Sequence, residues 1–158
     1  MKRNFKIALI IAVLIVVFLT FMDLQGYAMW QTVGGFSSDV YIRAQDDYMI
    51  QFWSFATALI VLVAGMYYLF RRDLSETIAV ALTSKLLLMG GLEDLLYYIF
   101  GKFPFENMPW LYEHLGVGTV AKVMGLETVT PTSLIISVLL FGTLAYFSAK
   151  WLEKQKKW

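Results

Sequence analysis

The chain has 158 residues, of which 59% are hydrophobic, and its formal net charge is +1. A soluble domain of this size could not bury so much apolar surface without leaving large apolar patches in water. No block of Lys and Arg could neutralise a row of phosphates, so a nucleic-acid partner is not expected. The absence of cysteine excludes an iron–sulfur cluster and Cys-ligated zinc.

Four apolar stretches predict transmembrane helices, since each approaches the ~20 residues needed to cross a ~30 Å hydrocarbon core. They cover residues of about 5–22, 49–70, 77–100 and 132–152, and outer loops cover about 23–48 and 101–131. We therefore predict an all-α integral membrane protein in which residues 1–158 form a single membrane domain. Its predicted architecture is a four-transmembrane-helix bundle with a structured outer cap formed by the two long loops.

The basic residues predict the orientation. They precede the first stretch, join the second to the third and follow the fourth: Lys2, Arg3, Lys6, Arg71, Arg72, Lys150, Lys154, Lys156 and Lys157. The positive-inside rule then predicts a multi-pass protein of the cell membrane with both termini cytoplasmic. The basic, apolar start also resembles a cleavable signal peptide, but its apolar run is long for one, and we expect an uncleaved anchor.

The two outer loops carry helix signals. Residues 39–48 are expected to extend the second helix beyond the membrane. In the second loop, Pro109 is typical of a helix start and Gly125 of a helix end. Between them Trp110 and His114 begin an apolar stripe at helical spacing, which predicts an amphipathic helix against the bundle.

Polar residues within apolar helices are costly, so those in the third stretch are the main candidate site residues. Glu93 and Asp94 are adjacent, and each has a phenol four residues later, at Tyr97 and Tyr98. The glycine pair at 90–91 would let a helix or ligand approach closely. Two buried carboxylates cannot both ionise cheaply, so we expect a bound proton, cation or polar ligand. The alternative is a packed bundle in which the pair only fixes helix register.

Two further features are expected to complete this site. Asp47 and Gln51, with Ser54, predict an inward-facing polar line on the second helix near the depth of the carboxylates. His114 is expected to point toward the bundle, either as an interface histidine or as a general base that closes the site. Lys85 is expected to snorkel toward the cytoplasmic surface.

The residues of the second loop add candidate ligands. Glu113 and Trp110 are expected to contact a ligand beside His114. Carboxylates with one imidazole favour Mg²⁺, Mn²⁺ or Ca²⁺, although no spacing matches a known metal motif, so a divalent cation held by carboxylates stays an open alternative.

These features support three functional hypotheses. The first is a membrane-embedded enzyme acting on a lipid or isoprenoid substrate near the outer leaflet, with Glu93, Asp94 and His114 as catalytic residues. The second is a proton- or cation-handling membrane protein. The third is a non-catalytic structural or assembly subunit. A homo-oligomer or a partner in a membrane complex is compatible with each of them.

Overall fold

A computed structural model describes the backbone of residues 3–32, 38–102, 108 and 111–155, and the side chains of these residues other than 27–32 and 38–49. The described chain is all-helical apart from one isolated antiparallel bridge between Met108 and Val129. Its helices are α1 (Arg3–Thr32), α2 (Ser38–Arg71), α3 (Leu74–Met89), α4 (Leu92–Gly101), α5 (Val117–Val123) and α6 (Pro131–Gln155).

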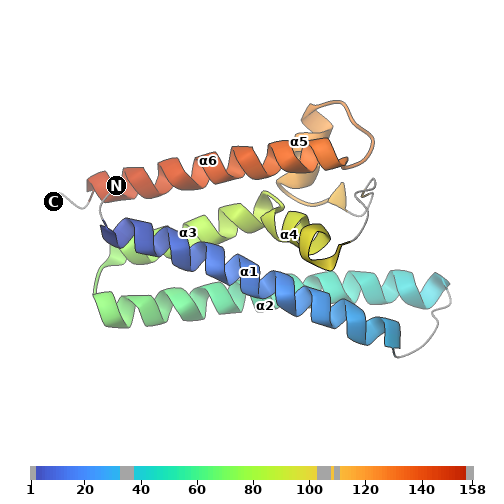
Figure 1. Ribbon diagram of the computed structural model, residues 1–158, viewed down its shortest axis with the longest axis horizontal. Helices are drawn as coiled ribbons and strands as arrows, with labels where there is room; N and C mark the ends of the chain where they lie inside the picture. The colour runs from blue at the N-terminus through green and yellow to red at the C-terminus, as the bar shows by residue number, and fades with distance from the viewer. Residues whose placement is uncertain (1–2, 33–37, 103–107, 109–110, 156–158) are drawn as a thin grey trace.

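The helix α3 is central and packs against α1, α2 and α6. The start of α1, the α2–α3 turn and the end of α6 lie at one end of the molecule, as Figure 1 shows, and α5 lies at the other. Consecutive long segments therefore alternate in direction, with α3 and α4 together forming the third. A second apolar cluster joins α4, α5, the isolated bridge and the start of α6.

Three of the described helices are long and apolar enough to cross a membrane, over Arg3–Gly26, Ile50–Arg71 and Pro131–Gln155. Their outward faces carry large exposed apolar side chains, among them Ile10, Leu14, Leu62, Leu69, Leu139 and Phe147. At 1.5 Å per residue, α3 is about 24 Å long and α4 about 15 Å, so neither alone would cross a ~30 Å hydrocarbon core.

The helix bounds differ from the sequence predictions in three places. The predicted helical extension over residues 39–48 is confirmed, because α2 begins at Ser38, whereas α1 continues past its predicted end to Thr32. The stretch predicted as one helix over 77–100 is divided into α3 and α4. The helix predicted to start at Pro109 begins only at Val117, because Gly116 has φ of 100° and ψ of −88°, which no helix accommodates.

The α2–α3 turn is fixed by a buried acid that sequence reasoning overlooked. Glu76 is fully buried, and its Oε2 accepts hydrogen bonds from the Tyr67 hydroxyl at 3.1 Å and from Arg71 Nε at 3.4 Å. Asp73 caps α3 by accepting a hydrogen bond from the Glu76 backbone N–H at 3.0 Å. The acid three residues after a capping Asp is the sequence signal that could have revealed it.

Candidate functional site

A helix break at Gly90–Gly91 organises the polar part of the molecule. Gly91 adopts the left-handed conformation, with φ of 81°, which ends α3 and lets α4 start in a new direction. The backbone there is tightly packed: a Cβ on Gly90 would lie 2.5 Å from Phe141 Cβ, and one on Gly91 would lie 2.6 Å from Leu134 Cδ1. The close approach of another segment to the glycine pair was expected from the sequence, whereas the helix break was not.

The break places Glu93 and Asp94 in the first turn of α4. The unpaired backbone N–H groups of a helix start carry partial positive charge, which favours negative side chains there. Glu93 is only 6% exposed, and its Oε1 has no hydrogen-bond partner among the described residues. The helix start thus offers partial positive charge to the buried carboxylate, but Glu93 Oε1 still lacks a hydrogen-bond donor among the described residues.

A third acid, Asp23 of α1, joins this pair and was missed as a site residue. Its charge acts electrostatically on both Glu93 and Asp94. The predicted first helix ended at residue 22, whereas α1 continues past it. The buried face of α1 includes Val16 and Leu19, and the same helical spacing continued to residue 23 could have found the acid. We call Asp23, Glu93 and Asp94 the carboxylate cluster.

The phenols expected to serve the carboxylates are close by in the same helix. Tyr98 is buried and Tyr97 is half-buried, and their rings meet edge to face at 6.0 Å between centroids. Because Glu93 Oε1 has no hydrogen-bond partner among the described residues, neither phenol hydroxyl serves that oxygen.

The polar line predicted on α2 does not face the bundle. Gln51 and Ser54 are exposed, and α2 instead turns Ala56 and Ile60 toward the core. These polar residues lie near the amino-terminal end of the Ile50–Arg71 stretch, and a polar side chain near the end of an apolar stretch can reach water at little cost. The side chain of Asp47 lies outside the described part of the chain, so its expected approach to the carboxylates stays a prediction.

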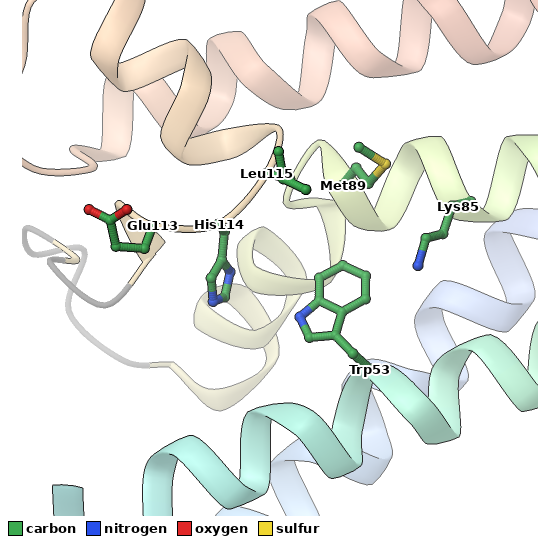
Figure 2. Close-up of a pocket in the computed structure, with 6 residues that line it drawn as sticks. All are labelled: Trp53, Lys85, Met89, Glu113, His114 and Leu115. Atoms are coloured by element: carbon green, nitrogen blue, oxygen red, sulfur yellow. The ribbon is translucent and has the colours of Figure 1, made fainter.

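The structure instead reveals a cavity on the α2 side of α3, with a volume of about 380 Å³. Three segments distant in sequence meet there, namely α2, the last turns of α3 and the turn segment 111–116 (Figure 2). Its lining is mainly apolar and aromatic, and consists of Trp53, Lys85, Met89, Glu113, His114 and Leu115.

The turn segment is held over α3 by close backbone contacts. A Cβ on Gly116 would overlap the Met89 carbonyl oxygen, and one on Gly118 would overlap the Tyr112 carbonyl oxygen. Only glycine permits these approaches: Gly116 brings the turn against the end of α3, and Gly118 brings α5 against the turn itself. His114 is thereby brought to the wall of the cavity.

His114 points into the bundle, as expected. Its ring packs edge to face on Trp53 at 6.4 Å between centroids, and Figure 2 shows it between Trp53 and Glu113. Burial lowers the pKa of His114 below its ordinary value of 6.5, so the ring is neutral at pH 7. A neutral imidazole can accept a proton or donate one hydrogen bond.

Lys85 does not extend toward the end of the molecule that holds the α2–α3 turn, contrary to the expectation that it would snorkel toward that end. Its Nζ lies 4.6 Å from the centroid of the Trp53 ring and 3.5 Å from Thr57 Oγ1. Thr57 comes seven residues after Ile50 and fourteen before Arg71, about 10 Å and 21 Å along the helix respectively. The ammonium group therefore points into the half of the molecule that holds His114, where the Trp53 ring attracts it.

Of the two other candidates of the second loop, Glu113 contributes to the cavity lining but is paired with Lys122. The Glu113 side chain is 81% exposed, and its Oε2 pairs with Lys122 Nζ at 3.0 Å. In Figure 2 its carboxylate points away from Lys85 and Trp53. Trp110 lies outside the described residues. Within the part of the chain that the structure describes, no group of three or more Asp, Glu and His side chains is arranged to hold a metal ion.

Comparison of the chain with protein-family models, with curated proteins and with solved structures gives no match. Two features near the helix break bear on its function. They are the carboxylate cluster and the cavity.

Proposed function

We propose that this chain is a four-span membrane protein in which α3 and α4 together make the third crossing. The three long apolar helices support this, and the combined length of α3 and α4 suffices for a fourth crossing. The end of the molecule that holds the α2–α3 turn carries Arg3, Lys6, Arg71, Arg72, Lys150 and Lys154. By the positive-inside rule that end faces the cytoplasm, and the cavity opens toward the outer leaflet.

The function we propose is binding of a lipid or isoprenoid at the cavity. The single observation that carries it is the 380 Å³ cavity itself, whose mainly apolar lining suits a hydrocarbon chain. Lys85 and His114 give it a polar end. If the protein is an enzyme, His114 is the group placed to move a proton on the bound molecule, because it is neutral at pH 7 and lies at the cavity wall.

A cavity-filling variant tests the proposal. Leu115 lines the cavity and is 77% exposed, whereas Val123 is 84% exposed, lies in α5 and does not line it. We expect Leu115→Trp to lose the lipid that copurifies with the wild type and Val123→Trp to retain it, as measured by native mass spectrometry in detergent. Equal lipid retention by the two variants, or a wild type without bound lipid, would refute the proposal.

The carboxylate cluster supports a second candidate function, the handling of protons or cations. The three acids come from two helices and repel one another when all are ionised, so a bound proton or cation would relieve that repulsion. Glu93→Gln keeps the shape and removes one charge. Loss of proton or cation flux in liposomes with unchanged thermal stability would support this function, and unchanged flux would exclude a role for Glu93.

The third hypothesis, a structural subunit, rests on the exposed apolar faces alone. Lipid covers such faces as readily as a partner helix does. Assembly of this chain into an oligomer or a larger complex therefore stays a prediction.

A further inference from the structure

Lys85 is a cation without an acidic partner in the described structure. The half-buried Lys85 side chain lines the cavity, and no carboxylate of the described residues is within ion-pair distance of its Nζ. An ammonium group has three N–H donors, and Thr57 Oγ1, at 3.5 Å, accepts one of them at the limit of a hydrogen bond. Two donors remain for another acceptor.

Among the described residues, neither Glu113 nor Glu93 pairs with Lys85. Glu113 lines the cavity, but its carboxylate pairs with Lys122 and points away from Lys85. The charges acting on Glu93 are the other carboxylates of the cluster, not Lys85. A lysine charge within an apolar helix is costly unless a counter-charge or water stabilises it, and the Trp53 ring offers only partial compensation. The cavity is where a counter-charge could enter.

We propose that the cavity binds an anionic amphiphile whose carboxylate or phosphate head group pairs with Lys85. This inference rests on the proposed lipid site and specifies its ligand. The charge of Lys85 selects an anion, and the apolar remainder of the lining, with Met89 and Leu115, selects one that carries a hydrocarbon chain. His114 can donate one hydrogen bond to the same head group, and Trp53 packs beside both side chains.

The test compares ligands that share one hydrocarbon chain and differ in their head groups. Wild-type protein in neutral detergent is titrated with oleate, with oleoyl lysophosphatidic acid and with the uncharged monoolein, and binding is measured by equilibrium dialysis. A charge-assisted hydrogen bond predicts that an anionic probe binds about tenfold or more tighter than monoolein. Oleate and the lysophospholipid together show which anionic head group is preferred. Inorganic phosphate, which has no hydrocarbon chain, tests whether the ligand needs one to bind.

Three variants assign the preference to Lys85. Lys85→Gln should reduce the anionic preference to less than about threefold, and Lys85→Arg should retain it. The matched control is Lys150→Gln, which removes an exposed lysine of α6 outside the cavity lining and should leave the preference unchanged. Lys85→Met provides a second uncharged variant, and thermal unfolding in detergent checks that each variant is folded.

The outcomes separate this inference from the proposed function. If monoolein binds as tightly as the anionic probes and Leu115→Trp abolishes binding of all three, the lipid site stands and the anionic ligand is wrong. An anionic preference that survives in both Lys85→Gln and Lys85→Met would also overturn the inference. If inorganic phosphate binds as tightly as lysophosphatidic acid, the inference that the ligand is an amphiphile is wrong. A wild type that binds no probe would overturn both proposals.

Discussion

The helix break can be tested by adding one methyl group, in the variant Gly91→Ala. Gly91 has φ of 81°, and a Cβ built there would lie 2.6 Å from Leu134 Cδ1 and 3.0 Å from Val117 Cγ2. The substitution therefore meets two obstacles, the left-handed backbone and a tightly packed neighbourhood. Neither would exist if residues 77–100 formed a straight helix, because alanine is favoured over glycine in a helix interior.

The expected loss of stability follows from these two terms. A left-handed residue with a side chain costs roughly 1–2 kcal/mol, and overpacking a filled site costs roughly 1–3 kcal/mol. The smaller conformational freedom of alanine in the unfolded chain offsets about 0.4–1 kcal/mol. We therefore expect Gly91→Ala to lower the free energy of unfolding by about 2–4 kcal/mol.

Gly65→Ala is the matched control for this variant. Gly65 lies within α2, and a Cβ built there meets nothing within 4 Å, so alanine should stabilise the protein by about 0.5–1 kcal/mol. Both variants are compared with the wild type by denaturant unfolding in mixed detergent micelles. If Gly91→Ala is as stable as Gly65→Ala, α3 and α4 are one continuous helix, and the placement of the carboxylates at a helix start is wrong.

Three further predictions concern orientation, capping and pH. Because the chain has no cysteine, Ser75→Cys and Thr119→Cys report topology: an impermeant maleimide should label Thr119→Cys on intact cells and Ser75→Cys only after permeabilisation, and the reverse would overturn the orientation. Asp73→Ala removes the cap of α3 and should cost about 1 kcal/mol in unfolding free energy, whereas an unchanged value would mean that water replaces the cap. Burial lowers the pKa of His114 below 6.5, so the unfolded chain takes up a proton first as the pH falls. The His114 contribution to stability should therefore be lost from about pH 6.5 down to its lower folded pKa, and a His114→Gln variant with the same pH dependence of melting as the wild type would contradict this.

The helical character and the three long apolar helices could be predicted from the sequence because hydrophobicity decides them locally. The break at Gly90–Gly91 could not, because the apolar pattern runs on past it and each glycine weakens a helix by only about 1 kcal/mol. What accompanies the break is close packing around Gly91, where a Cβ would lie 2.6 Å from Leu134 Cδ1 and 3.0 Å from Val117 Cγ2. These partners come from later in the chain.

The candidate site was predicted only in part for the same reason. Glu93 and Asp94 could be identified because acids in an apolar helix are rare. The cavity could not, since Trp53, Lys85 and His114 meet only through packing of α3 with α2 and the turn segment 111–116. The polar line on α2 was misplaced because a polar residue near the end of a transmembrane helix can face water at little cost.

Lys85 and Glu93 are ionisable side chains on either side of the helix break, and no ion pair joins them. Lys85 is half-buried and Glu93 is buried. Because neither side chain compensates the burial of the other, each requires a partner of its own. The cavity and the carboxylate cluster are then independent sites, and the effects of Lys85→Gln and Glu93→Gln on unfolding free energy should add to within about 0.5 kcal/mol in the double variant. Denaturant unfolding of the wild type, both single variants and the double variant measures this. A coupling larger than about 1 kcal/mol would show that the two side chains share a partner or interact across the break. The cavity and the carboxylate cluster would then be parts of one site.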